Sequence, residues 1–248
     1  MAHKMTQWKS LDLLAPMLIL ALLTLVFRLT DLDPFIESFF YIQGKGWVYA
    51  DMNPWSFLYR YGTLPAIVLA VGSLLVFACS FLLSRFYPYR RKALFGVLLM
   101  LIGPGLIVNL IFKDHWGRPR PREVNIFSGQ ERFLPAWEKG ISGNGRSFPC
   151  GHASMGFYLF SPFFVLRKTS RRWALCFLTL GIGYGAFMGL GRMIQGGHFA
   201  SDVIWSGGFV YLCGWGLCRL LRLDRPTPDI GAGNKIRNPN IEIRNNTE

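Results

Sequence analysis

The chain has 248 residues and carries 27 lysines and arginines against 14 aspartates and glutamates, a net charge of +13. Half of its residues are hydrophobic (51%), and only 17% are charged. This combination excludes a disordered chain, a collagen-like fibre and a small disulfide scaffold. It also argues against a nucleic-acid-binding protein, because such proteins rarely combine long apolar runs with so few charges. The excess positive charge must therefore be explained together with a membrane.

Six apolar runs approach the roughly 20 residues of helix needed to cross a hydrocarbon core. The sequence therefore predicts an all-α, polytopic membrane protein with six transmembrane helices, over 11–27, 64–83, 93–112, 153–166, 173–190 and 203–221. The fourth run is short unless its helix begins near Pro149, and we expect Pro162 to kink it. The first run could instead be a signal peptide, but its length and the absence of a small-residue cleavage site favour an uncleaved anchor.

The distribution of lysine and arginine orients these helices, because short cytoplasmic loops are enriched in both. Sixteen of the 27 fall on one side: Lys4, Lys9, Arg85, Arg90, Arg91, Lys92, Arg167, Lys168, Arg171, Arg172, Arg219, Arg222, Arg225, Lys235, Arg237 and Arg244. Both termini are therefore predicted to be cytoplasmic. The long loop 113–152 is then external.

Three further segments affect the expected organisation. Residues 1–225 are predicted to form one membrane domain, and 226–248 a disordered cytoplasmic tail. The external loop 31–62 is rich in aromatic residues, which fits either a segment lying on the bilayer or an ordinary aromatic belt. Gly181, Gly185 and Gly189 recur every four residues, a spacing that predicts close helix packing.

Three external stretches carry chemically useful side chains. The first runs from Lys113 to Arg120 and Pro121, at the end of the third helix. The second is Ser147-Phe-Pro-Cys150-Gly151-His152, and the third runs from Gly191-Arg192 to His198 and Asp202. The third stretch joins the fifth and sixth helices. Each stretch alone is weak evidence for a functional site. All three lie on the same side of the predicted membrane topology, and together they indicate one site.

Their residue types suit a phosphate group. Lys113, Arg120 and Arg192 would be costly near a membrane without an anion or water, and guanidinium groups pair well with phosphate oxygens. Gly151 allows close backbone approach at a helix start, where unpaired N–H groups favour an anion. His198 and Asp202 are four residues apart, so the carboxylate could orient a histidine nucleophile. His152 could then protonate the leaving group. We expect a phosphoryl-transfer site without a metal or other cofactor.

The ordered set Lys-x6-Arg-Pro, Pro-x-Gly-His and Arg-x5-His-x3-Asp resembles the type-2 phosphatidic acid phosphatase superfamily. The motif region is 113–202, and the six-helix layout extends the likeness to most of the chain. The resemblance implies that His198 attacks phosphorus and forms a phosphohistidine, with Asp202 orienting it. It implies that His152 serves as acid and then base, while Lys113, Arg120, Arg192 and the Gly151 amide bind phosphate oxygens.

Two positions depart from the family pattern. Cys150 and Gly191 stand where the family has, or often has, serine. A thiol donates more weakly than a hydroxyl, so one phosphate contact is expected to be poorer or to come from Ser147. Cys150 is not expected to be the nucleophile, because cysteine phosphatases of the Cys-x5-Arg type need an arginine six residues on, where this chain has Gly156.

The motifs look closest to lipid A phosphatases, but they do not separate these from phosphatidylglycerophosphate or undecaprenyl pyrophosphate phosphatases. Additional loop cations suit a polyanionic head group: Arg118, Arg122, Arg132, Lys139 and Arg146. Alternatives are a lipid-to-lipid phosphotransferase and, outside enzymes, a transporter or a lipid-binding protein. The haloperoxidases of the superfamily are soluble, which the six runs argue against. The resemblance also implies a multi-pass protein of a bacterial inner membrane, with its active site facing the periplasm. The expected partners are a membrane lipid phosphate and the bilayer, with no nucleic acid.

Overall fold

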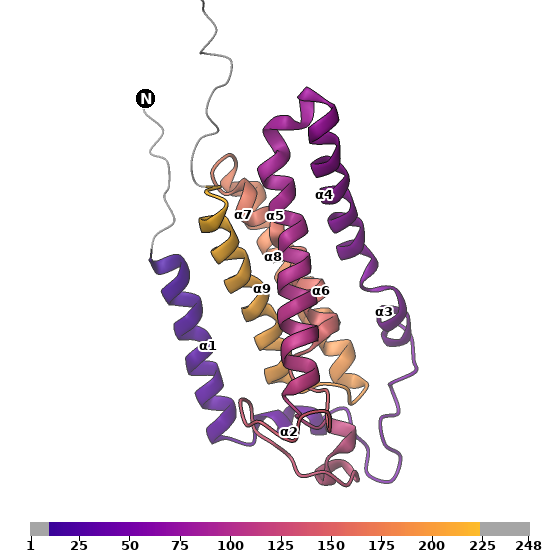
Figure 1. The fold of residues 1–248 in the computed structure, drawn as a ribbon. Helices are drawn as coiled ribbons and strands as arrows, with labels where there is room; N and C mark the ends of the chain where they lie inside the picture. Colours follow the sequence, from indigo (N-terminus) through magenta and orange to yellow (C-terminus); the bar gives the residue numbers. More distant parts are fainter. Residues whose placement is uncertain (1–9, 224–248) are drawn as a thin grey trace, which may run out of the picture.

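The computed structural model describes residues 10–223, and every regular element among them is helical (Figure 1). The predicted tail 226–248 and the cations at Lys4 and Lys9 lie outside this range. The longer helices are α1 (Leu11–Leu29), α4 (Leu64–Leu82), α5 (Arg90–Met100), η2 (Leu101–Lys113), α8 (Arg171–Ile194) and α9 (Ala200–Leu220). The shorter ones are α2 (Leu32–Ser38), α3 (Trp55–Tyr61), η1 (Ser84–Tyr89), η3 (Pro121–Glu123), η4 (Asn125–Phe127), α6 (Gly151–Tyr158) and α7 (Ser161–Leu166).

Within residues 10–223, five helical stretches are long and apolar enough to cross a membrane. They are Leu11–Leu29, Trp55–Leu82, Ser84–Lys113, Arg171–Ile194 and Ala200–Leu220. They correspond to the first, second, third, fifth and sixth predicted helices. The all-α expectation is confirmed, and the count of long helices differs by one.

The difference lies in the fourth predicted helix, which is divided into α6 and α7. Pro162 is the second residue of α7, so it cannot donate a hydrogen bond back into the preceding turn. The helix therefore breaks at Leu159 and Phe160, and the two pieces pack inside the bundle. The sequence predicted a kink at Pro162, and the structure shows a complete break in the helix.

The third long stretch changes its winding before it reaches the site. After α5 the chain continues as π-helix in η2, which contains Pro104. Pro104 has no N–H to donate into the preceding turn. Its own carbonyl oxygen accepts a hydrogen bond from the Asn109 side chain, five residues later, at 2.7 Å. This winding carries Lys113 to the end of the helix, where the external loop begins.

Helix α8 packs closely on its neighbours through its repeated glycines. A Cβ atom on Gly181, Gly185 or Gly189 would lie 2.2–2.4 Å from Phe160, Phe157 or Val203, respectively. These distances leave no room for a side chain, so the prediction of close packing is confirmed. The contacts fix α8 against α6, α7 and the start of α9.

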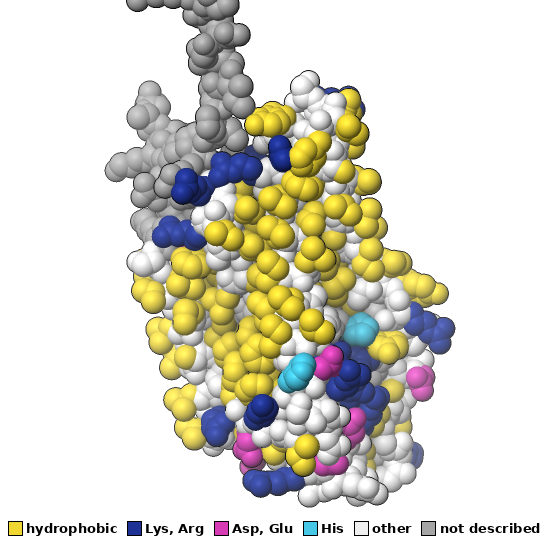
Figure 2. All heavy atoms as spheres, in the orientation of Figure 1, with side chains coloured by type: hydrophobic (Ala, Val, Ile, Leu, Met, Phe, Trp, Pro, Cys, Tyr) yellow, Lys and Arg dark blue, Asp and Glu magenta, His cyan; other side chains and the backbone are white. Residues whose placement is uncertain are grey.

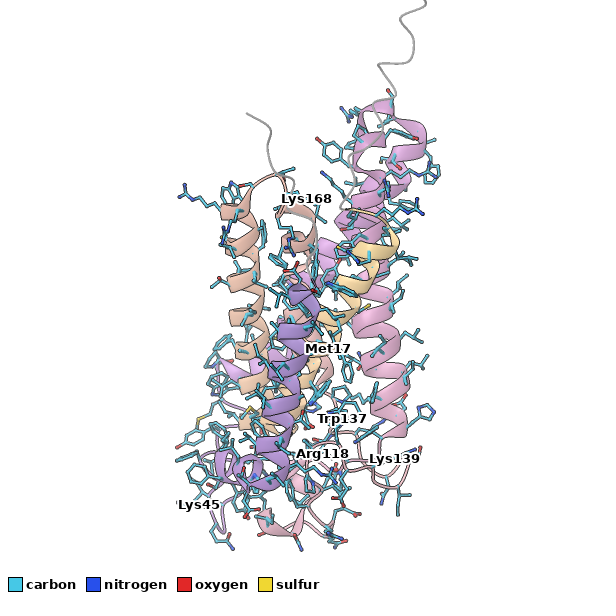
Figure 3. All side chains as sticks on the ribbon, turned by 90° about the vertical axis from the view of Figure 1, so that its left-hand side faces the viewer. Met17, Lys45, Arg118, Trp137, Lys139 and Lys168 are labelled. Carbon is cyan, nitrogen blue, oxygen red and sulfur yellow. The ribbon has the colours of Figure 1, made fainter. Side chains whose placement is uncertain are left out.

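The two ends of the bundle differ in charge. On the face drawn in Figure 2, hydrophobic side chains form a broad band; Lys and Arg gather above it, whereas Lys, Arg, Asp, Glu and His all occur below it. In Figure 3, Lys168 marks the upper end, while Lys45, Arg118 and Lys139 lie at the lower end with α2 and the external loop. The three motif stretches also reach this lower end.

Candidate active site

A polar cavity of about 290 Å³ opens at the lower end of the bundle. It is lined by five residues singled out from the sequence, namely Lys113, Arg120, His152, Arg192 and His198. Ala50, Asp51, Tyr59, Arg122 and Gln195 complete the lining. The remaining expected residues, Gly151, Cys150, Ser147 and Asp202, lie behind this layer. The motifs meet here because each lies at the lower end of a helix.

The cavity cations are positioned by helix ends and have donors to spare. Lys113 is the last residue of η2, and Arg192 lies in the last turn of α8. The Arg192 guanidinium donates to the Gln195 side chain and lies over the ring of Tyr59, 4.6 Å from its centroid. The Nε atoms of Arg120 and Arg192 are buried without an acceptor among residues 10–223. Unmatched buried donors of this kind suit an anion in the cavity.

Gly151 lies where a side chain would not fit. A Cβ atom there would be 2.5 Å from Asn109 Oδ1 and 3.2 Å from Lys113 Nζ. The first residue of α6 therefore approaches η2 closely, near the Lys113 ammonium. Only glycine leaves room for this approach.

His198 is almost completely buried, and its Nδ1 lies 2.5 Å from the carbonyl oxygen of Ser147. A carbonyl only accepts, so Nδ1 carries the proton, and the lone pair of the neutral ring is on Nε2. Burial lowers the pKa of His198 to about 4, although Asp202 acts in the opposite direction. A neutral imidazole with a free Nε2 at the cavity is suited to nucleophilic attack.

Asp202 holds the residues around His198 more closely than it holds His198 itself. Its Oδ2 is 3.8 Å from His198 Nδ1. The same oxygen accepts from the Ser147 hydroxyl at 2.6 Å and from the Phe199 amide at 2.8 Å. Asp202 therefore orients His198 mainly through Ser147, and it stands near enough to stabilise an imidazolium.

Ser147 has a different environment from the one expected. Its hydroxyl has a single proton, which goes to Asp202, and its side chain is fully buried. It consequently offers no donor to a phosphate in the cavity. The geometry gives Ser147 a supporting task in place of the phosphate contact expected from the sequence.

His152 is held by an aromatic neighbour from another part of the chain. Its imidazole stacks on Tyr59 of α3, with ring centroids 4.9 Å apart and planes inclined by 22°. Arg192 lies over the same tyrosine ring. Tyr59 thus contacts both an imidazole and a guanidinium that line the cavity.

Cys150 is the residue before α6 and is fully buried. Burial raises the pKa of its thiol to about 11, even though Arg192 and Lys113 act in the opposite direction. A thiol that stays protonated and inaccessible is a poor nucleophile. These properties support the expectation that Cys150 is not the nucleophile.

The expectation that Arg118 is a head-group cation is wrong. Its side chain is fully buried and forms ion pairs with Asp33 and Asp202. Its charge is therefore already compensated inside the protein. Arg146 is exposed but pairs with Asp114, whereas Arg122 does line the cavity as a cation beyond the motifs.

The residues that the sequence did not reveal come mainly from loop 31–62. This loop forms α2 and α3, supplies Ala50, Asp51 and Tyr59 to the cavity, and buries Asp33 against α9. Acidic residues in an apolar chain were a possible signal, but nothing local indicated their partners. The loop is thus a wall of the site as well as an aromatic segment.

The arrangement can hold an anion and transfer a phosphoryl group. Three expected cations and one additional arginine line the cavity, and so do two imidazoles, His152 from α6 and His198 from the turn between α8 and α9. Cations can stabilise charge on a transferring phosphoryl group, and a neutral imidazole is chemically able to act as a nucleophile. A second imidazole is able to transfer protons.

Comparison with known proteins gives a consistent result. Residues 92–225 match the PAP2 superfamily. A lipid A 4'-phosphatase of Francisella tularensis subsp. novicida is 41% identical over 161 residues, which cover 64% of this chain and 72% of that protein. A lipid A 4'-phosphatase of Rhizobium etli is 38% identical over 114 residues, or 46% of this chain and 43% of that protein. One of Rhizobium leguminosarum is 36% identical over 116 residues, covering 46% and 48%. No solved structure gave a significant match.

Proposed function

The chain belongs to the PAP2 superfamily, and from that membership we propose that it removes a phosphate from lipid A at the periplasmic leaflet through a phosphohistidine intermediate. Family and relatives make it a lipid phosphatase, a hydrolase of phosphoric monoesters in a bacterial membrane. The proposal adds the lipid, the side of the membrane and the intermediate. The observation that carries it is the single cavity in which the cations and both imidazoles meet.

The proposed reaction has two steps. Nε2 of His198 attacks phosphorus, and the bond from phosphorus to the lipid oxygen breaks while protonated His152 gives that oxygen its proton. Neutral His152 then takes a proton from water, which attacks the phosphohistidine, and the P–N bond breaks to release inorganic phosphate. Asp202 stabilises the positive charge on His198 between the steps.

Lys113, Arg120, Arg192 and the Gly151 amide are proposed to bind the phosphate oxygens. Their positions around or next to the cavity support this assignment. Because positive side chains can supply this stabilisation, the reaction is proposed to need no metal. Cys150 contributes its backbone position at the start of α6, and its thiol is not required.

The relatives support the choice of lipid, since all three are named as lipid A 4'-phosphatases. Phosphate release from purified lipid A, phosphatidylglycerophosphate and undecaprenyl pyrophosphate, measured in EDTA, tests the proposal. We expect release from lipid A by the wild type and none by His198→Gln. Preference for another lipid would overturn the substrate assignment, and transfer of labelled phosphate to a second lipid would show a phosphotransferase. A lack of release from every lipid would contradict the phosphatase reaction.

We also propose that α6 and α7 together form a sixth crossing, with both termini in the cytoplasm and the cavity in the periplasm. The cation-rich upper end and the position of Lys168 opposite the site support this orientation (Figures 2 and 3). Ser142 and Ser84 are both exposed. In the proposed orientation Ser142 lies on the periplasmic side and Ser84 on the cytoplasmic side. A membrane-impermeant maleimide should label Ser142→Cys, but not Ser84→Cys, in cells with a permeabilised outer membrane. The opposite pattern would reverse the proposed orientation.

A further inference from the structure

Arg118, which lies at the lower end of the bundle (Figure 3), is hydrogen-bonded to three separate segments of the chain. Its Nε donates to the carbonyl oxygen of Leu134 at 2.9 Å. One terminal nitrogen donates to Asp33 Oδ2 at 2.8 Å, and the other donates to Asp202 Oδ1 and, at 2.8 Å, to Ser201 Oγ. All the charged groups involved have fully buried side chains. A buried charge is tolerated only with such complete pairing.

Asp33 fixes α2 to the first turn of α9. Its Oδ1 accepts from the Ser201 amide at 3.0 Å, and its Oδ2 accepts from the Ser201 hydroxyl. Ser201 directly precedes Asp202 in the chain. Arg118 and Asp33 are 85 positions apart in the sequence. Both are nevertheless bonded to the first turn of α9, which carries Asp202.

The division of contacts on Asp202 is informative. Arg118 occupies Oδ1, so Oδ2 is directed to the Ser147 hydroxyl and the Phe199 amide. Ser147 in turn holds Nδ1 of His198 through its carbonyl oxygen. A continuous set of hydrogen bonds thus runs from Arg118 through Asp202 and Ser147 to the imidazole.

Neither Arg118 nor Asp33 lines the cavity, so neither is placed to contact phosphate. We propose that they form a positioning pair, which sets the orientation and charge of Asp202 and thereby the tautomer and position of His198. This inference rests on the proposed phosphatase reaction. It adds that α2, through Asp33, helps to position the groups that carry out that reaction. Helix α2 lies outside the 92–225 segment that matches the family.

The charges give the pair its physical role. Burial raises the pKa of Asp33 while Arg118 opposes that shift, and the two carboxylates keep the pKa of Arg118 above its usual value despite burial. Without the guanidinium, two buried carboxylates would repel each other and one would take up a proton. Asp202 would then stabilise a His198 imidazolium less well, while the phosphate-binding cations would remain in place.

The test compares Arg118→Lys and Asp33→Asn with Glu37→Gln, all as full-length protein in detergent. Glu37 is a matched control, since it is also fully buried on α2 and has no hydrogen-bond partner among residues 10–223. Burial raises the pKa of Glu37 well above its usual value, so glutamine closely mimics its neutral form. The readouts are kcat and KM for lipid phosphate hydrolysis, orthovanadate affinity, and the His198 tautomer by ¹⁵N NMR.

We expect kcat to fall about 100-fold in Arg118→Lys and about tenfold in Asp33→Asn, because small displacements of catalytic groups have effects of this size. KM and vanadate affinity should stay within about threefold of the wild type, since the cavity cations are untouched. The fraction of His198 protonated at Nδ1 should decrease in both variants. Glu37→Gln should resemble the wild type in every readout.

Unchanged kcat and an unchanged His198 tautomer in folded Arg118→Lys and Asp33→Asn would overturn the positioning role. So would an increase in KM with kcat intact, or a failure of both variants to fold, which would make the pair purely structural. Absence of turnover in the wild type would contradict the proposed function instead. The NMR comparison would then still decide whether the pair positions His198.

Discussion

Nδ1 of His198 lies 2.5 Å from the carbonyl oxygen of Ser147. A backbone carbonyl thus selects the tautomer that leaves Nε2 with its lone pair toward the cavity. Asp202, which the sequence suggested as the direct partner, is 3.8 Å away and bonds to the Ser147 hydroxyl. The imidazole is consequently held by a segment that itself depends on Asp202.

Ser147→Ala separates the two possible roles of this serine. The variant keeps the carbonyl contact to His198 and removes only the hydroxyl bond to Asp202. We expect kcat to fall about tenfold with little change in KM, because the lost contact supports the transition state and not substrate binding. An increase in KM at constant kcat would instead show that the hydroxyl binds phosphate. Steady-state kinetics with a lipid phosphate substrate distinguish these outcomes.

His198→Gln should abolish turnover while leaving the protein folded. Glutamine cannot form a phosphohistidine, so kcat should fall by more than about 10⁴-fold. With ³²P-labelled substrate and rapid acid-free quenching, the wild type should carry a base-stable, acid-labile label that the variant lacks. Matching melting temperatures would show that the fold is intact. Labelling of the variant at wild-type levels would require a different nucleophile.

His152→Gln should affect the two chemical steps differently according to the leaving group. With an ordinary lipid phosphate, loss of the acid should lower kcat by about 10²–10⁴-fold. With p-nitrophenyl phosphate the leaving group needs no proton, so the first step should persist while hydrolysis slows. A burst of p-nitrophenol equal to the enzyme concentration would then be seen in stopped-flow absorbance. Equal losses for both substrates, without a burst, would argue against His152 as acid and base.

The sequence predicted the members of the cavity lining that lie at helix ends. Lys113, His152, Arg192 and His198 belong to different helices or the turns beside them, and an alternating topology brings these ends to one side. Spacing and residue type were sufficient for them. The interrupted fourth crossing was foreshadowed by Pro162, because the effect of proline on a helix is local.

The supporting residues could not be predicted in the same way. Arg118 and Asp33 are ordinary loop charges in the sequence, and nothing within a few residues of either indicates burial. Their pairing depends on how loop 31–62 folds over the end of α9, which is a tertiary property. The stacking of Tyr59 on His152 has the same origin.

The titration of His198 predicts how stability depends on pH. Its pKa is about 4 in the folded protein, mainly because of burial, against 6.5 for an ordinary histidine. Between these values the unfolded chain binds a proton that the folded protein does not, so stability is lost as pH falls from 6.5 toward 4. The melting temperature should therefore decrease more steeply over this range in the wild type than in His198→Gln, which cannot titrate at this position. Parallel profiles in detergent would contradict the lowered pKa.

Cys150→Ser restores the residue that the family usually has before the helix start. The thiol is fully buried and, because of burial, has a pKa of about 11. Serine is among the best residues at a helix start, so the variant should melt at a higher temperature. Its kcat should stay within about threefold of the wild type, because the proposed reaction does not use the thiol. N-ethylmaleimide should leave wild-type turnover unchanged for the same reason. Inhibition that disappears in Cys150→Ser would show an accessible and functionally important thiol, and would require a new account of the α6 start.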